Sequence, residues 1–156
     1  MNATINNTAD RELVITKLLN APRELVWEAW TNPKHVVNWW GPDGFTNTIH
    51  EMTVKPGGVW RFMMHGPNGM DFPNKIIFNE VVKPEHLTYT HSSEDENDPN
   101  VFHTTVTFEN QNGKTLLTMR AIFATAEERN RVVNEYGAAE GGIQTINKLE
   151  QYLSKM

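Results

Sequence analysis

Residues 56–75 read PGGVWRFMMHGPNGMDFPNK and set the two-residue rhythm on which the predicted fold depends. Trp60, Phe62 and Met64 alternate with more polar positions such as Arg61 and His65, as expected for a strand with one apolar face. Glycine and proline on both sides mark turns. One apolar strand face suits both a packed core and the wall of a cavity, and the alternation alone leaves these two interpretations open.

The same short-period pattern continues on both sides of this stretch, from Gly44 to Phe123. Asn112-Gly113 is a strong hairpin signal, because both residues tolerate a positive φ. The pattern predicts an antiparallel meander of six strands. The predicted strands cover residues 45–54, 58–65, 74–82, 86–92, 101–109 and 115–124.

The flanking segments predict one more strand and three helices. A strand rich in leucine and β-branched residues begins near Arg11 and ends at Pro22, and two short helices follow over residues 22–32 and 32–42. Residues 125–156 predict one long helix with an apolar stripe that must lie against a sheet. Gly137, Gly141 and Gly142 interrupt this helix, which indicates a kink or the close approach of something bulky.

Composition predicts one domain over residues 11–156, preceded by a flexible leader of residues 1–10. The formal net charge of −5 and the scattered lysines and arginines argue against a nucleic-acid partner. The sequence has no long apolar run, so we expect no membrane insertion. It has no cysteine, which suits a cytoplasmic location.

Together these elements predict an α+β fold: a seven-stranded curved antiparallel sheet, two short helices, and a long C-terminal helix over the concave face. A curved sheet that grips one helix encloses more space than the helix stripe can fill, particularly near the two short helices. A cavity is therefore an expected by-product of this arrangement.

Several segments resemble one known superfamily. They are APRELVWEAWTNP, WW, KPGGVWRF, GPNGMDFPNK, EVVKPEHLTYTH and EGGIQTINKLEQYL, within residues 11–154. Their order resembles the SRPBCC, or START-like, superfamily, and more narrowly the family named after the C-terminal domain of the activator of the heat-shock-protein-90 ATPase. The resemblance implies a helix-grip fold with a deep cavity between sheet and C-terminal helix.

Members of that superfamily bind lipids, sterols, polyketides and other apolar molecules, and some are cyclases or hydrolases. The resemblance thus implies a binding domain for an apolar or aromatic small molecule or lipid, with an acid–base enzyme using the same cavity as the alternative. A chaperone-related interaction module is a third expectation, although the eukaryotic co-chaperone has an additional N-terminal domain for which this sequence has no room. The oligomeric state stays open between monomer and homodimer.

Motifs for metal, cofactor or nucleophilic chemistry are not found. The six histidines form no helical His-x-x-x-His or His-Glu-x-x-His pair, so we expect neither a metal site nor a cofactor. The sequence has no Gly-x-Ser-x-Gly elbow and no phosphate-binding glycine loop. The acidic stretch at residues 94–98 lacks the spacing of a calcium loop and is interpreted as a solvated hairpin tip.

The candidate ligand-binding residues are those expected on the concave strand faces, near the two adjacent tryptophans and on the facing helix. They are Trp39, Trp40, Phe45, Trp60, Phe62, Met64, Phe72, Ile76, Phe78, Tyr89, His91, Phe102, Met119, Phe123, Tyr136, Glu140 and Ile143. No catalytic residue is assigned. For the enzyme alternative, Glu80, Tyr89, His91 and Glu140 are the residues whose burial could shift a pKa and create an acid or base.

Overall fold

The computed structural model describes residues 9–92 and 101–156. Most of the predicted leader, residues 1–8, and the predicted acidic hairpin tip, in residues 93–100, fall outside the described residues. Among the described residues, no helix is both long and apolar enough to span a membrane.

Seven strands form one antiparallel sheet in the order β1-β7-β6-β5-β4-β3-β2. Consecutive strands from β2 to β7 are neighbours, so the predicted meander is confirmed, and β1 closes the sheet by pairing with β7. The strands are β1 (Glu12–Leu19), β2 (Thr46–Met52), β3 (Val59–His65), β4 (Asp71–Val82), β5 (His86–Ser92), β6 (Phe102–Gln111) and β7 (Lys114–Phe123).

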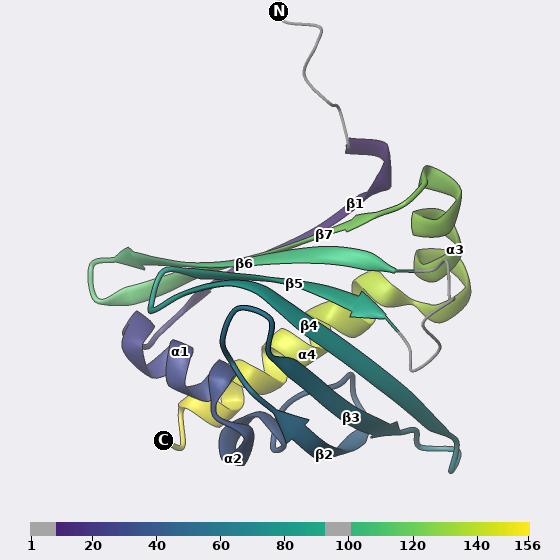
Figure 1. Ribbon diagram of the computed structural model, residues 1–156. Helices are drawn as coiled ribbons and strands as arrows, with labels where there is room; N and C mark the ends of the chain where they lie inside the picture. The colour runs from purple at the N-terminus through teal and green to yellow at the C-terminus, as the bar shows by residue number, and fades with distance from the viewer. Residues whose placement is uncertain (1–8, 93–100) are drawn as a thin grey trace, which may run out of the picture.

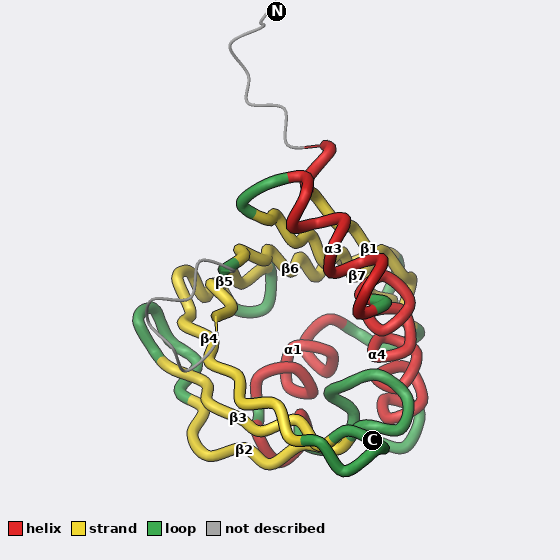
Figure 2. Tube along the Cα trace, turned by 90° about the vertical axis from the view of Figure 1, so that its right-hand side faces the viewer, coloured by secondary structure: helices red, strands yellow, loops and turns green. Residues whose placement is uncertain are grey.

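The helices lie at two points of the chain. A 3-10 turn, η1 (Ala9–Arg11), precedes the sheet, and α1 (Arg23–Thr31) and α2 (Pro33–Val36) connect β1 to β2. The chain ends with α3 (Ala126–Tyr136) and α4 (Ala138–Leu153). Figures 1 and 2 show that the sheet curls and that α4 crosses its concave side, with α1 at one end. The predicted α+β helix-grip arrangement is confirmed.

The predicted continuous helix over residues 125–156 is wrong, because α3 and α4 are separated at Gly137; the kink interpretation of the glycines and the long helix under the sheet, α4, are confirmed. This glycine has φ 61° and ψ 37°, a left-handed conformation that ends α3 and that other residues adopt at a cost. Thr125 caps the start of α3, where its side chain accepts a hydrogen bond from the backbone N–H of Glu128. The break lets α3 pack near β1 and β7 while α4 turns beneath the sheet.

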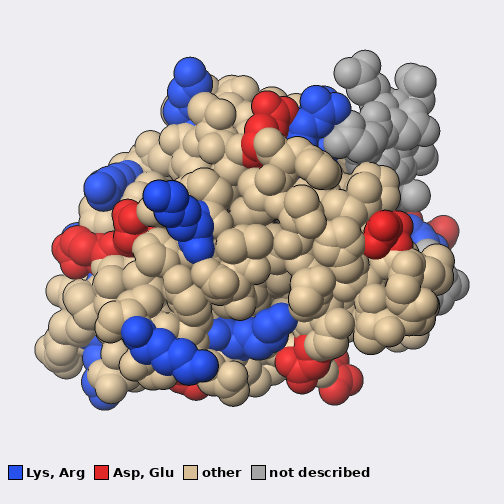
Figure 3. Space-filling view, turned by 90° about the horizontal axis from the view of Figure 1, so that it is seen from below, with Lys and Arg blue, Asp and Glu red and all other residues tan. Residues whose placement is uncertain are grey.

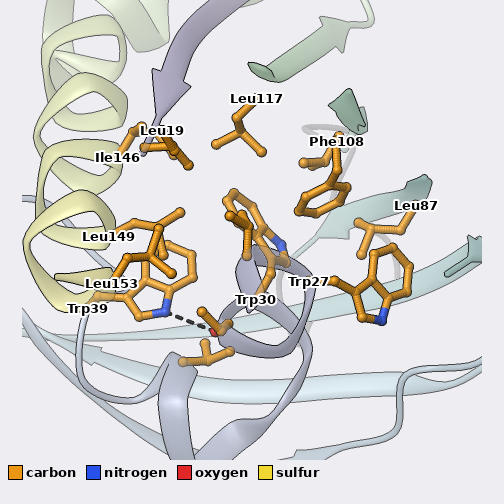
Figure 4. Close-up of a cluster of buried hydrophobic side chains, with 14 of the residues drawn as sticks. Leu19, Trp27, Trp30, Trp39, Leu87, Phe108, Leu117, Ile146, Leu149 and Leu153 are labelled. Carbon is orange, nitrogen blue, oxygen red and sulfur yellow. Dashed lines mark hydrogen bonds between the residues drawn. The ribbon is translucent and has the colours of Figure 1, made fainter. Parts of the chain in front are cut away.

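The core lies between the sheet, α1 and the C-terminal half of α4. Trp27 and Trp30 of α1 make edge-to-face contacts with Phe108 of β6, with ring centroids 5.3 and 6.0 Å apart. Figure 4 shows these rings together with Ile146 and Leu149 of α4. This end of the molecule is therefore filled with side chains.

The stretch that decides the fold forms β3 and the start of β4. Trp60, Phe62 and Met64 are buried, as the alternation predicts. On the opposite face, Arg61 pairs with Glu51 of β2 at 3.6 Å, with both side chains partly exposed. The apolar face of β3 therefore points into the concave side of the sheet.

Candidate functional site

A cavity of about 280 Å³ lies between the concave sheet face and the N-terminal half of α4. Its wall is mainly apolar, with a few polar groups. It is lined by Leu13, Ile15, Trp40, Gly41, Pro42, Met64, Tyr89, His91, Phe102, Thr104, Met119, Ala121, Phe123, Gly137, Ala138, Gly141, Gly142 and Thr145. Five strands, α4 and the loop after α2 thus contribute to one site.

Small residues on α4 explain why this end of the concave side is hollow. Gly141 and Gly142 face the cavity and contribute no side chain to fill it. A Cβ added at Gly142 would overlap Cδ1 of Ile15, so glycine there leaves room for the end of the Ile15 side chain, which also lines the cavity. The same helix fills the other end with Ile146 and Leu149. The position of the cavity therefore follows from the order of small and large residues along α4.

His91 is a histidine of the cavity wall whose pKa is well below its ordinary value. Its imidazole lies 4.7 Å from the Phe102 ring, measured between centroids. Its Nε2 lies 2.8 Å from Oδ1 of Asn74. Burial lowers the pKa of His91 from 6.5 to about 4. The residue keeps some accessible surface, and this is consistent with a ring that borders the cavity. At neutral pH His91 is uncharged.

Tyr89, two residues earlier on β5, faces the same cavity and is 2% exposed. Burial raises the pKa of Tyr89 well above its ordinary value, and a side-chain hydrogen bond with Thr104 offsets part of that rise. Thr104 is the partner of Tyr89 across the β5–β6 ladder and also lines the cavity. The wall therefore presents neutral hydroxyl groups.

The loop that contributes Trp40, Gly41 and Pro42 to the cavity is held by α4. The ammonium group of Lys148 donates to the carbonyls of Gly41 at 3.0 Å and Pro42 at 3.3 Å. Burial lowers the pKa of Lys148, and the carboxylate of Asp43 opposes that shift. This lysine fixes one wall of the cavity without itself lining it.

Seven of the predicted ligand-binding residues line the cavity. They are Trp40, Met64, Tyr89, His91, Phe102, Met119 and Phe123. They come from four strands and the loop after α2, and the strand residues all occupy inward-facing positions.

Five other predicted residues belong to the buried core and are not among the residues of the cavity wall. They are Trp39, Trp60, Phe62, Ile76 and Phe78. The strand residues among them do occupy the predicted concave side, but this part of the sheet is covered: the Trp40 ring lies 4.8 Å from that of Trp60 and 6.2 Å from that of Phe62. Alternation gives the face of the sheet that a residue occupies, not its position along the strand relative to the helices.

Four predicted residues lie elsewhere. Phe45 packs against the core, and its ring lies 6.2 Å from that of Phe72, which is 40% exposed near the β3–β4 turn. Glu140 is exposed and Ile143 is 50% exposed, because α4 turns Gly141, Gly142 and Thr145 inward instead. The side chain of the remaining candidate, Tyr136, is outside what the structure describes.

Sequence reasoning missed two small residues of the wall, Thr104 and Ala121, and the partner of His91, Asn74. Thr104 and Ala121 occupy inward positions of β6 and β7, so strand alternation could have found them. Their size, rather than an apolar pattern, creates the space. Asn74 becomes recognisable only when β4 and β5 are paired, because its contact with His91 crosses the ladder.

Glu80 and two of the histidines outside the cavity, His65 and His86, have surface partners. Glu80 is exposed and lies 3.8 Å from Nε2 of His86. On the outer face of the sheet, His65 lies 2.7 Å from the Asp71 carboxylate and 2.8 Å from the Thr48 hydroxyl. Residues 9–92 and 101–156 contain no group of three metal-binding side chains close enough to hold an ion.

Charges of both signs occur on the molecular surface seen in Figure 3, separated by uncharged areas. None of the residues that line the cavity is a lysine, arginine, aspartate or glutamate. The cavity therefore differs from the surface in having no formal charge at neutral pH.

Comparison with known proteins identifies one family model. Residues 20–154 match the model described as Activator of Hsp90 ATPase homolog 1-like protein. The match begins directly after β1 and covers α1, α2, strands β2 to β7 and the last two helices. A comparison with curated proteins gives no match.

Solved structures with the same fold come from several bacteria. A protein from Arthrobacter aurescens is 25% identical, with a TM-score of 0.87 over 97% of this chain and 91% of that one. A protein from Mycobacterium smegmatis is 25% identical, with a TM-score of 0.83 and coverages of 93% and 91%. A protein from Nitrosomonas europaea is 26% identical, with a TM-score of 0.81 and coverages of 94% and 96%.

Proposed function

Because the chain belongs to the family of Activator of Hsp90 ATPase homolog 1-like proteins, we propose that it is a small-molecule-binding domain. Its ligand is apolar or aromatic and occupies the space between the sheet and α4. The observation that supports this proposal is the cavity of about 280 Å³, whose wall is mainly apolar and has a small number of polar groups. Binding sites for small molecules have this composition.

The size of the cavity limits the ligand. An apolar cavity of roughly 150 Å³ holds benzene, so a volume about twice as large suits a molecule of about two rings. Aromatic side chains of the wall, such as Trp40 and Phe102, would contact the faces or edges of such rings. Long-chain lipids would need to extend through the cavity opening.

Filling the cavity from β7 is expected to prevent binding. Ala121 lies between inward-facing Met119 and Phe123 on the same strand, so Ala121→Phe places a ring in the cavity. We expect the affinity for naphthalene, measured by calorimetric titration, to fall more than about tenfold, since the aromatic side chain occupies the ligand's volume. The free energy of unfolding should stay equal or rise by about 0.5–2 kcal/mol, as for other cavity-filling changes.

The matched control is Ile122→Phe, which adds a ring at the adjacent position on the opposite face of β7. This variant should bind naphthalene as the unmodified protein does. Equal loss of binding in both variants, or unchanged binding in Ala121→Phe, would contradict the assignment of the ligand to this cavity.

An acid–base enzyme that uses the same cavity is the second candidate. His91 favours it, because an uncharged imidazole at neutral pH can accept a proton from a bound substrate. Glu80 and Glu140, the carboxylates considered from the sequence, do not line the cavity. Turnover of a bound hydroxylated substrate that is lost in His91→Phe, while substrate affinity persists, would favour the enzyme over the binding domain.

The chaperone-related module has weaker support. Exposed large apolar side chains are distributed over several described elements, with Val14 and Leu18 on β1 and Met70 and Phe72 at the β3–β4 hairpin. A cytoplasmic location and the choice between monomer and homodimer likewise stay predictions.

A further inference from the structure

The hydrogen bonds around Asn74 determine which nitrogen of His91 is protonated. The amide Nδ2 of Asn74 donates to the carbonyl of Phe72 at 2.9 Å. Its Oδ1 must therefore be the atom that faces Nε2 of His91, 2.8 Å away. An amide oxygen only accepts hydrogen bonds, so Nε2 of His91 is the nitrogen that holds the hydrogen.

The other ring nitrogen of His91 is then an acceptor. Burial keeps the imidazole neutral at pH 7, so Nδ1 has a free lone pair. Within residues 9–92 and 101–156, His91 makes one side-chain hydrogen bond, the bond through Nε2. A ring that lines the cavity with an unused acceptor is a point at which a ligand can form a hydrogen bond.

The charges around the cavity select against ionised ligands. Two cationic side chains of the described structure bind backbone carbonyls of wall residues: Lys148 donates to those of Gly41 and Pro42, and Arg11 to that of Phe123. A carboxylate ligand would lose its hydration without gaining a cationic partner, and the lone pair of His91 would repel it. An ammonium ligand would find no carboxylate in the wall.

We propose that the cavity selects uncharged two-ring molecules bearing a hydroxyl group, which donates its hydrogen to Nδ1 of His91. This inference rests on the proposed binding function and specifies the ligand class for the same cavity. Asn74 acts as a positioning residue: by accepting from Nε2 it holds the imidazole in the tautomer that presents Nδ1 as acceptor.

Two probes of nearly equal size distinguish the contribution of the hydroxyl group to binding from that of the rings. In 2-naphthol a hydroxyl replaces the methyl group of 2-methylnaphthalene, which cannot donate. His91→Phe should weaken 2-naphthol binding roughly tenfold, the effect of one lost hydrogen bond, and change 2-methylnaphthalene binding by less than about twofold. 2-Naphthoate should bind at least about tenfold more weakly than 2-naphthol to the unmodified protein.

The control variant is His103→Phe, which changes an exposed histidine whose Nδ1 lies 2.9 Å from the Thr90 hydroxyl, away from the cavity. It should leave all three affinities unchanged. A spectroscopic test needs no variant: in protein labelled with ¹⁵N-histidine, Nε2 of His91 should be protonated and Nδ1 unprotonated, and the Nδ1 resonance should move when 2-naphthol is added.

The outcomes distinguish this inference from the function on which it rests. If both neutral probes bind in the cavity but His91→Phe weakens them equally, or if Nδ1 is the protonated nitrogen, the hydroxyl selection is wrong and the binding function stands. If neither neutral probe binds, the proposed function itself is contradicted. If His91→Phe does not fold, the naphthoate comparison and the ¹⁵N spectrum decide.

Discussion

Trp39→Ala is expected to lower the free energy of unfolding by about 3–5 kcal/mol, the range for removing a buried aromatic side chain. Trp39 is 1% exposed, and its ring centroid lies 4.9 Å from that of Trp30. Its Nε1 also donates to the carbonyl of Ala29 at 3.0 Å, the bond drawn dashed in Figure 4. The substitution therefore leaves a void and removes a buried hydrogen bond. Urea unfolding followed by far-ultraviolet circular dichroism measures the change.

The neighbouring tryptophan supplies the matched control. Trp40 is half-buried and borders the cavity, so part of its surface has no protein contact to lose. We expect Trp40→Ala to lower the free energy of unfolding by less, about 1–2 kcal/mol, but to weaken naphthalene binding. Trp39→Ala should preserve naphthalene binding in the folded fraction. A stability loss in Trp40→Ala equal to or larger than that in Trp39→Ala would contradict the assignment of Trp39 to the core and Trp40 to the cavity.

Stability should also decrease in mild acid because of His91. Its pKa is about 4 in the folded protein and 6.5 in the unfolded chain. Between these values the unfolded chain binds more protons, so the full stability is present above about pH 6.5 and is lost as the pH falls towards 4. The contribution is about 2–3 kcal/mol, reduced somewhat by water that reaches the ring from the cavity.

The His91→Phe variant isolates this contribution from that of the carboxylates, which titrate in both proteins. Urea unfolding at a series of pH values measures the free energy of unfolding of both proteins. The difference between the unmodified protein and the variant should change by about 2–3 kcal/mol between pH 7 and pH 4. A difference that is constant over this range would mean that His91 is not buried as described.

The sheet could be predicted from sequence because its signal is local. Alternation of Trp60, Phe62 and Met64 with polar residues gave both the strand and its inward face, and the Asn112-Gly113 turn gave the last hairpin. A shift of one residue would have exposed the whole apolar set, so the register follows from the pattern.

The C-terminal helix shows where local pattern reasoning fails. Gly137, Gly141 and Gly142 look equivalent in sequence, but they have different roles. Gly137 ends a helix in a left-handed conformation, whereas Gly142 is helical and allows the contact with Ile15. Which glycine breaks the helix depends on where α4 must turn to cross the sheet, and that is a tertiary requirement.

The cavity was the least predictable feature, because it is defined by what small residues leave unfilled. Trp40 and Phe102 were anticipated as large apolar residues, and alternation places Ala121 on the inward face, but nothing in the sequence shows that the space in front of Ala121 and Gly141 stays unfilled. The pairing of His91 with Asn74 depends on strand register and on the direction of one amide group. Neither can be obtained from a single sequence.

Methyl NMR on protein labelled at the methionine ε-methyl groups tests the binding site most directly. Met64 and Met119 line the cavity, whereas Met70 and Met156 are 55% and 42% exposed elsewhere. On titration with 2-naphthol, the Met64 and Met119 resonances should shift and saturate together, and those of Met70 and Met156 should not move. Saturating shifts at Met70 or Met156 with none at Met64 and Met119 would contradict binding between the sheet and α4.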